Sequence, residues 1–328
     1  MRCIIRSVAA VCTIAAAFAL ERPAVHAAEA FSSRPITIIV PFPPGGSTDK
    51  GARMIAKSLQ DSLGQPVIID NRGGGNGIIG IQALKQAAPD GYTLFVGHAA
   101  THAINPGLYS NLPYDPVKDF TPITPFMSFP SVLVVPAASP DKSVADLIRR
   151  AREKPGSLTY SSQGVGTAGH LLGAMLESAA GVKLVHVPMK GAAPAVAEVV
   201  AGRVDMVFSS YITAGGFVKD GRLRMLSMAS SKRSEALPDL PTMAELGVPG
   251  VDLDYWFGIF GPAGMPPRIV QRLNAELIKA VHSPAVSDSL TSQAADVITS
   301  SPEEFAALIE ADGKRLGKLV RDTGMKAD

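Results

Sequence analysis

The sequence predicts an α/β fold of two lobes, each a mainly parallel sheet flanked by helices, with a ligand cleft between the lobes. Short apolar, β-branched runs alternate with helical patterns, which is typical of βαβ units on a parallel sheet. The chain has 328 residues, 46% of them hydrophobic, and this is more than one ordinary core accommodates. A unit of strand, glycine turn and helix start also occurs twice, which indicates two similar lobes.

The first of these units spans residues 35–50. Its run Ile36–Val40 is apolar and β-branched, as expected of a strand buried on both faces. Prolines at 41, 43 and 44 then end the ladder, Gly45 and Gly46 allow a tight turn, and residues 47–49 suit a helix N-cap. Backbone N–H groups at such a turn can bind an anion, whereas a turn that is merely tight would explain the same residues.

The remaining elements follow from apolar runs and their periodicity. Further strands are expected at 66–70, 92–96, 131–135, 158–162, 182–187, 204–208, 222–229 and 256–260. Helices are expected after residue 47, through 81–84, and at 144–152, 171–179, 195–200, 269–278 and 302–325, while 105–116 is expected to be irregular. The second strand–turn–helix unit begins with the strand at 158–162.

Two strands are expected to cross between the lobes, 131–135 and 256–260, with hinges at their ends. Lobe 1 is then residues 28–129 plus 256–328, and lobe 2 is residues 130–255.

The N-terminus predicts a cleaved export signal, residues 1–27. Arg2 and Arg6 precede an apolar run at 8–20, and a small-residue cleavage site follows at 25–27. Cleavage removes both cysteines and also Arg2, Arg6, Arg22 and Glu21, so the 31 basic and 29 acidic residues become 28 of each. The product is expected to be a soluble periplasmic protein without disulfide or thiol chemistry.

Several motif matches do not favour an enzyme or a cofactor. Two G-x-G-x-x-G runs start at Gly75 and Gly164, and two such matches in one glycine-rich chain indicate coincidence. The first also has extra loop residues after its strand, and the next strand ends without the acidic residue of a dinucleotide site. His98 and His102 have the spacing of metal ligands on a helix, but no third ligand can be named. Without a basic run interleaved with aromatic residues, nucleic acid is not an expected partner. No catalytic residue, cofactor or metal is predicted.

A set of ordered motifs resembles the Bug family, the TctC-like extracytoplasmic receptors of tripartite tricarboxylate transporters. The motifs are PITIIVPFPPGGSTD, QPVIIDNRGGGNGIIG, PDGYTLFVG, THAINPGLY, SSQGVGTAGHL, VPMKGAAPAVAEVVAGRVDMVF and LPTMAELGVPG. Each is weak alone, but together they cover essentially the whole mature chain. The resemblance implies a type II-like periplasmic-binding-protein fold that closes on a small carboxylated ligand, a di- or tricarboxylate, an acidic amino acid or an aromatic acid. It also implies a monomer that delivers this ligand to TctA- and TctB-like permease subunits.

By the same resemblance, the ligand-binding residues come from both lobes. The turn after the first strand would hold one carboxylate, and further residues would complete the wall and approach from the second lobe. The residues so implied are Phe42, Pro44, Gly45, Gly46, Ser47, Asp49, Asn76, Gly77, His98, Thr101, Ser161, Ser162, Gly166, Thr167, His170 and Asp205.

Alternatives remain open for several of these residues and for the function. Asp49 could only cap its helix, His170 could only satisfy a carbonyl, and Asp205 could serve the fold. His98 stands where a small or hydroxyl residue is expected, and a histidine there could stack on an aromatic acid or pair with a second carboxylate. The rival functions are an exported hydrolase with a Ser/His pair, a carboxylate sensor without a transport role, and a structural surface protein.

Overall fold

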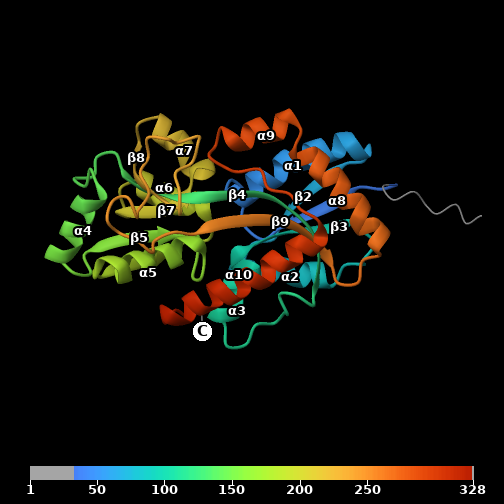
Figure 1. Ribbon diagram of the computed structural model, residues 1–328, viewed down its shortest axis with the longest axis horizontal. Helices are drawn as coiled ribbons and strands as arrows, with labels where there is room; N and C mark the ends of the chain where they lie inside the picture. The colour runs from blue at the N-terminus through green and yellow to red at the C-terminus, as the bar shows by residue number, and fades with distance from the viewer. Residues whose placement is uncertain (1–32, 327–328) are drawn as a thin grey trace, which may run out of the picture.

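Two groups of parallel strands form the two ends of the molecule, and two longer strands join them (Figure 1). The computed structural model describes residues 33–326, so the predicted export signal lies outside the described residues. Within this range, nine strands form one sheet in the order β2-β1-β3-β9-β4-β7-β5-β6, with β8 paired to β4. We call the end that contains β1 the first part and the end that contains β5 the second part.

In the first part, β1 (Ile36–Val40) lies between β2 (Val67–Asn71) and β3 (Thr93–His98) and is parallel to both. Its isoleucine and valine side chains are buried, as the sequence predicts for a central parallel strand. The helices of this part include α1 (Ser47–Leu63), α2 (Ile78–Lys85), α8 (Pro267–Val281) and α9 (Pro284–Thr291), and α1 packs on α8 and α9.

In the second part, β5 (Leu158–Ser162) is the central strand, parallel to β6 (Leu184–Pro188) on one side and to β7 (Met206–Ser210) on the other. Strand β6 ends the sheet on this side, and β8 (Leu223–Ala229) pairs antiparallel with β4. Four helices surround these strands: α4 (Val144–Glu153), α5 (Ala168–Ala180), α6 (Ala192–Val200) and α7 (Tyr211–Lys219).

The two parts are joined by β4 (Phe120–Pro136) and β9 (Asp254–Pro262), which run antiparallel to each other through the middle of the molecule. The predicted crossover strands lie within these two. Both also pair antiparallel with the strands beside them, so the sheet is mixed and only its two ends are parallel. That the parts move as lobes with the boundaries given above stays a prediction.

Sequence periodicity missed several elements near prolines. The first half of β4 was not predicted because Pro122, Pro125 and Pro130 interrupt it, and its register shifts beside the first two. The stretch 105–116, expected to be irregular, begins with a turn of helix, α3 (Asn105–Leu108), because proline is tolerated in the first turn. The π-helical turn Ala100–Ile104, the 3₁₀ turn Gly75–Gly77, α7 and α9 were also missed.

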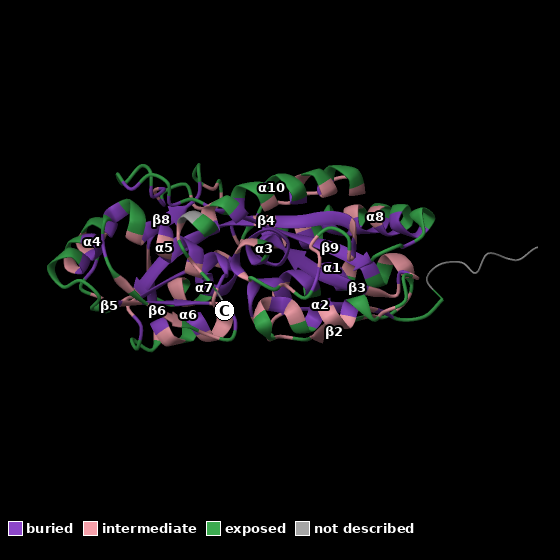
Figure 2. Cartoon of the chain, turned by 90° about the horizontal axis from the view of Figure 1, so that it is seen from below, coloured by how far each residue is buried: buried purple, intermediate pink, exposed green. Residues whose placement is uncertain are grey.

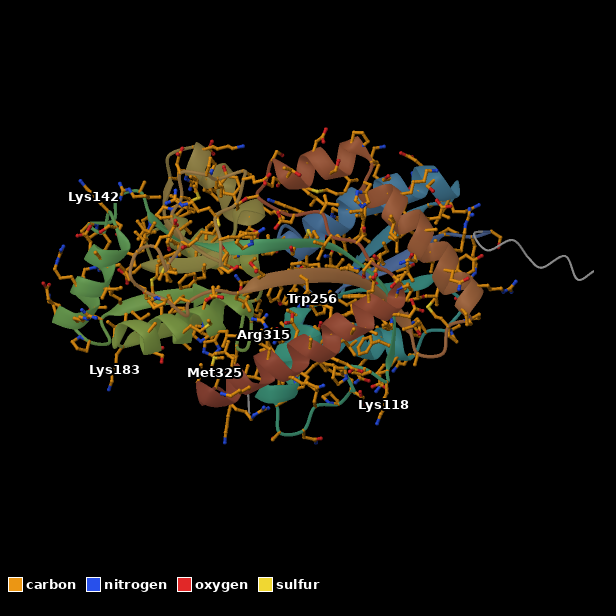
Figure 3. All side chains as sticks on the ribbon, in the orientation of Figure 1. Lys118, Lys142, Lys183, Trp256, Arg315 and Met325 are labelled. Atoms are coloured by element: carbon orange, nitrogen blue, oxygen red, sulfur yellow. The ribbon has the colours of Figure 1, made fainter. Side chains whose placement is uncertain are left out.

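The C-terminal helix α10 (Pro302–Asp322) packs against the turn Ala100–Ile104, α3 and β4, and is drawn below β9 in Figure 1 and above β4 in Figure 2. Ser301 and Glu304 form a capping box at its start. Trp256 of β9 donates its indole N–H to Asp312 at 2.7 Å, and Arg315 pairs with the same carboxylate at 3.0 Å (Figure 3). Among the described helices, none has both the length and the apolar character required to cross a bilayer.

Candidate ligand-binding site

A partly enclosed cavity lies between the two parts of the sheet. Its walls come from the β1–α1 turn, the joining strands β4 and β9, the β5–α5 turn, the start of α6 and the end of β7. The lining residues are Phe42, Gly46, Ser47, Thr48, Phe129, Ser131, Gln163, Thr167, Ala168, Ala192, Ser209, Ser210, Tyr255 and Phe257. None of these lining residues carries a charge.

Four helices begin at this cavity. The N-cap or first residue of α1, α5, α6 and α7 is among its lining residues, namely Gly46, Thr167, Ala192 and Ser210. Each helix N-terminus presents unpaired N–H groups and the equivalent of roughly half a positive charge. The cavity is therefore electropositive through its backbone, although no cationic side chain lines it.

The first-turn N–H groups of these helices are not capped by N-cap side chains. Two of the N-cap residues, Gly46 and Gly191, have no side chain, and within residues 33–326 the side chains of the other two, Thr167 and Ser210, accept no hydrogen bond from their helices. Away from the cavity, Ser143 caps α4 and Ser301 caps α10 in the usual way. Thr167 instead donates to Gly164 O at 2.8 Å, and Ser210 Oγ lies 3.1 Å from Thr213 Oγ1. Gln163 satisfies one N–H of α5, that of Gly169 at 3.2 Å, so an anion has the remaining N–H groups available.

Several hydroxyl groups around the cavity also lack protein partners. Ser47 and Thr48 are buried at the first turn of α1, and Ser131 is buried on β4. No hydrogen bond from any of these three hydroxyls is formed within the described chain, and the buried Ser209 hydroxyl is likewise unpartnered. Buried polar groups are normally paired. Hydroxyls gathered at a cavity therefore point to a polar occupant.

Asp49 holds the β1–α1 turn through hydrogen bonds and does not line the cavity. Its carboxylate accepts from Gly45 N at 3.0 Å, from Arg53 Nε at 3.0 Å and from Asn71 Nδ2 at 3.0 Å. Burial alone would raise the pKa of this carboxyl, but the hydrogen bonds from Arg53, Gly45 and Asn71 together lower it. The ionised group thus holds the turn in shape, which is closer to the local role than to ligand contact.

Aromatic rings form the wall on the joining strands. Phe129 of β4 is paired directly with Tyr255 of β9, and Phe257 lies two residues further along β9, so the three side chains share one face. Their ring centroids are 5.2 Å apart for Phe129 and Phe257, 5.3 Å for Tyr255 and Phe257, and 6.2 Å for Phe129 and Tyr255.

His98 lies behind this wall and is fully buried. Its ring stacks on Phe42 with centroids 5.2 Å apart, and its Nδ1 lies 2.8 Å from the Tyr255 hydroxyl. Because His98 Nδ1 also accepts the backbone N–H of Thr101 at 3.4 Å, this nitrogen carries no proton. We therefore assign the Tyr255 hydroxyl, which itself accepts from Ala100 N at 3.1 Å, as the donor to His98 Nδ1. The Nε2 atom has no hydrogen-bond partner among the described residues. Burial and the neighbouring His102 lower the pKa of His98 to about 3, so the ring is neutral.

Polar contacts of its own residues hold the β5–α5 turn in the second part. Gly166 N donates to His170 Nδ1 at 3.1 Å, and the His170 ring stacks on His186 with centroids 3.9 Å apart. Ser162 Oγ lies 2.6 Å from His186 Nε2 and 2.9 Å from Gly164 O. Burial lowers the pKa of both histidines to about 4. His170 therefore accepts a hydrogen bond from a backbone N–H of the turn. The local alternative had expected it to donate to a carbonyl.

The two parts touch each other beside the cavity. Lys50 Nζ of α1 donates to Ile212 O of α7 at 2.8 Å. A Cβ on Gly46 would lie 3.4 Å from Ala192 Cβ, and one on Gly166 would collide with the Leu108 side chain. The two parts are therefore in contact here, and glycines allow their backbones to approach.

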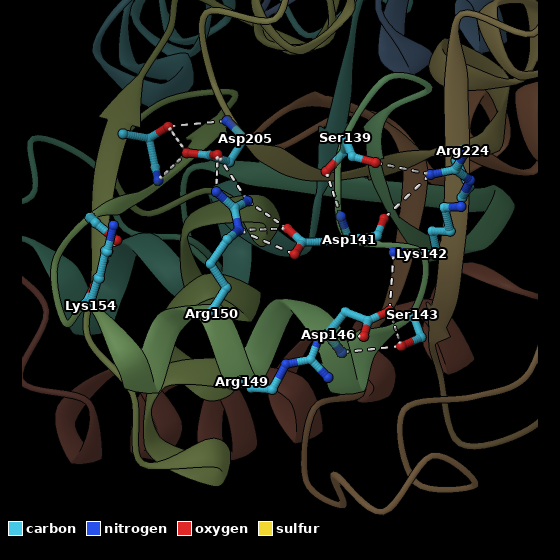
Figure 4. A network of polar contacts seen from close by, with 12 residues as sticks. Ser139, Asp141, Lys142, Ser143, Asp146, Arg149, Arg150, Lys154, Asp205 and Arg224 are labelled. Atoms are coloured by element: carbon cyan, nitrogen blue, oxygen red, sulfur yellow. Dashed lines mark hydrogen bonds and ion pairs between the residues drawn. The ribbon is translucent and has the colours of Figure 1, made fainter.

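Asp205 lies in a separate network at the far end of β5 and β7 (Figure 4). Its carboxylate accepts from Arg150 Nη2 at 3.0 Å, from Thr159 N at 2.9 Å and from Thr159 Oγ1 at 2.8 Å. Arg150 also pairs with the buried Asp141. Every one of these contacts serves the fold, as the local alternative for Asp205 supposed, and Asp205 is not among the residues that line the cavity. Its contact with the ligand stays a prediction.

The other implied residues divide between the cavity and its supports. Phe42, Gly46, Ser47 and Thr167 line the cavity. Phe42, Pro44 and Asn76 line an outer groove between the two parts, which shares Phe42 and Gln163 with the cavity. The remaining residues hold turns or neighbouring backbone and line neither space: Gly45, Gly77, Thr101, Ser161, Ser162, Gly166 and His170.

Sequence reasoning missed most of the second-part and joining-strand residues. Ser209 and Ser210 end a strand just before a helix, a signal like that at Ser47, and could have been found. Phe129, Tyr255 and Phe257 could not, because only the pairing of β4 with β9 brings them together.

The sequence is similar to transport receptors over nearly its whole length. Residues 51–325 match the family model described as tripartite tricarboxylate transporter family receptor, TctC. A UPF0065 protein in the tcbD-tcbE intergenic region of Pseudomonas sp. strain P51 is 40% identical over 301 residues, 92% of this chain and 89% of that protein. Protein BugT of Bordetella pertussis is 36% identical over 300 residues, 91% and 92% of the two chains.

Solved structures share the fold. R. palustris Rpa4515 with adipate has 35% identity and a TM-score of 0.87, covering 90% of this chain and 99% of that one. The periplasmic binding protein BugD has 31% identity and a TM-score of 0.85, covering 90% and 99%. MatC from Rhodopseudomonas palustris with bound malate has 32% identity and a TM-score of 0.83, covering 88% and 99%. The predicted fold class is thereby confirmed.

Proposed function

The chain belongs to the TctC family of tripartite tricarboxylate transporter receptors, and from this premise we propose that it captures a small organic carboxylate and delivers it to a membrane permease. It is a solute-binding protein by family. The ligand occupies the cavity between the two parts of the sheet, which close on it in the periplasm. The permease partner is of the TctA and TctB type.

The convergence of four helix N-termini on one cavity carries this proposal. A carboxylate there receives hydrogen bonds from backbone N–H groups, chiefly residues 47–49 of α1 and the first turn of α5. Charge-assisted bonds of this kind require no cation, and none lines the cavity. Helices from both parts contribute, so a bound carboxylate stabilises the closed form over any open one.

The solved relatives support the same ligand class. Rpa4515 was determined with adipate and MatC with malate, and both compounds are small carboxylates. The outer groove that shares Phe42 and Gln163 with the cavity supplies a route to solvent.

A thermal-shift screen of the purified protein tests the function. Mono-, di- and tricarboxylates, aromatic acids and acidic amino acids are each added in excess, after one cycle of unfolding and refolding that removes any bound ligand. A ligand that binds only the folded state stabilises it by about 2.7 kcal/mol at a hundredfold excess over Kd. We expect a clear rise in Tm with at least one carboxylate. No rise with any acid after refolding would contradict the proposal.

Two aspartates that both stabilise the fold are expected to differ in their effect on binding. Asp49→Ala removes the acceptor that holds Gly45 in the β1–α1 turn, so we expect ligand affinity to fall about tenfold. Asp205→Ala breaks the Arg150 network and should cost about 1–3 kcal/mol of unfolding free energy, with ligand affinity unchanged. Calorimetric titration with the best acid from the screen measures both. If Asp205→Ala lowered ligand affinity and Asp49→Ala did not, Asp205 would be a ligand-binding residue and this prediction would be wrong.

A further inference from the structure

The aromatic wall of the cavity is a fixed surface. Phe129, Tyr255 and Phe257 stand on paired strands, are at most 6% exposed and contact one another. These strands join the two parts, so the wall belongs to neither part alone. Rings held in this way lose little conformational freedom when a ligand packs on them.

Tyr255 is further fixed by a buried polar network. Its hydroxyl lies 2.8 Å from His98 Nδ1 and accepts from Ala100 N at 3.1 Å. Both hydrogen-bonding directions of the hydroxyl are thus used within the protein, which leaves the ring itself as the surface that Tyr255 offers to a ligand. The neighbouring His98 ring stacks on Phe42, a fourth aromatic lining residue.

The cavity therefore has two kinds of lining group. Helix N-termini and the unpartnered hydroxyls of Ser47 and Thr48 suit a carboxylate. Four aromatic rings, three on the joining strands and that of Phe42 on the β1–α1 turn, suit a flat apolar body. A flexible aliphatic acid with polar groups along its whole length would place some of those groups against the rings, where they lose hydration without gaining a partner.

We propose that the ligand of this receptor is an aromatic carboxylate, with its carboxylate at the N-termini of α1 and α5 and its ring against Phe129, Tyr255 and Phe257. This inference rests on the proposed function and narrows it to one ligand class. Phe129 and Tyr255 are the residues that set the preference for a ring, because they face each other across β4 and β9.

Benzoate and cyclohexanecarboxylate form a matched pair of probes. They share one carboxylate and a six-membered ring, but only benzoate is flat and aromatic. Ring pairs add about 0.5–1.5 kcal/mol beyond buried area, which corresponds to roughly two- to twelvefold in affinity. We expect the refolded protein to bind benzoate more tightly than cyclohexanecarboxylate by about that factor, and to bind adipate and malate more weakly than benzoate.

Variants then test whether the aromatic wall causes the preference for benzoate over cyclohexanecarboxylate. Tyr255→Leu and Phe129→Leu should each bring the affinities for benzoate and cyclohexanecarboxylate to within about twofold of each other. Tyr255→Phe keeps the ring and should keep the preference. Phe217→Leu, on α7 and outside the lining residues, is the control for loss of a phenylalanine. Two independent wall positions keep the test usable if one variant does not fold.

The outcomes separate this inference from the function beneath it. Tighter binding of adipate or malate than of benzoate would overturn the proposal that the ligand is aromatic. The proposed function as a carboxylate receptor would still stand. Equal binding of benzoate and cyclohexanecarboxylate by the unaltered protein would also overturn it. Failure of every acid to bind would instead overturn the proposed function.

Discussion

Gly166→Ala is expected to weaken ligand binding by about ten- to hundredfold. Gly166 has φ +75°, and a Cβ there would collide with the buried Leu108 side chain of the first part and lie 3.3 Å from Asn76 Nδ2. The closed form must then either distort the turn before α5 or hold the two parts further apart. Overpacking of this kind costs about 1–3 kcal/mol, and each 1.36 kcal/mol is tenfold in affinity. Calorimetric titration with the best-binding carboxylate measures the loss.

Two further variants separate the collision from backbone strain. Gly181 ends α5 with φ +62° and has no atom near its Cβ position, so Gly181→Ala should lower stability and leave affinity unchanged. Adding Leu108→Ala to Gly166→Ala should recover part of the lost affinity, because it removes the colliding side chain. If Gly166→Ala bound as tightly as the unaltered protein, the geometry described here for the contact between the two parts would be wrong.

Acid is expected to destabilise the protein strongly below pH 6.5. His98 and His102 are fully buried, and burial lowers the pKa of each to about 3. The unfolded chain takes up a proton on each ring near pH 6.5 and the folded chain does not, so stability is complete above pH 6.5 and is lost as pH falls toward 3. At pH 5 the loss is about 2 kcal/mol for each of the two histidines.

Urea unfolding at pH 7 and pH 5 measures this loss. His170 and His186, with pKa values lowered to about 4, add to it in the same direction. His102→Leu should reduce the difference between the two pH values, because it removes one of the buried imidazoles. Equal stability at pH 5 and pH 7 would show that the buried rings gain protons in the folded state.

The sequence predicted those parts of the site that are formed by one short segment of the chain. The β1–α1 and β5–α5 units could be predicted because each places a strand, a glycine turn and a helix start within some fifteen residues. Phe42, Gly46, Ser47 and Thr167 followed from them and from the family resemblance. Strand β5 was predicted with its observed bounds.

The rest of the cavity depends on pairing between distant segments. Phe129 and Tyr255 are 126 residues apart, and only the β4–β9 register places them on one face. Asp205 also shows how the position of a residue depends on the direction of its strand. The family resemblance implied a ligand contact for this carboxylate inside the predicted strand 204–208, but the strand direction puts it at the end of the sheet away from the cavity, next to Arg150.

The position of a bound carboxylate tests the central claim most directly. We would determine the crystal structure of the protein with benzoate, or with whichever acid gives the largest thermal shift. The account predicts carboxylate oxygens within about 3.2 Å of backbone nitrogens in the first turns of α1 and α5, with no arginine or lysine in contact. A carboxylate bound outside the cavity between the two parts, or held by a cationic side chain, would contradict it.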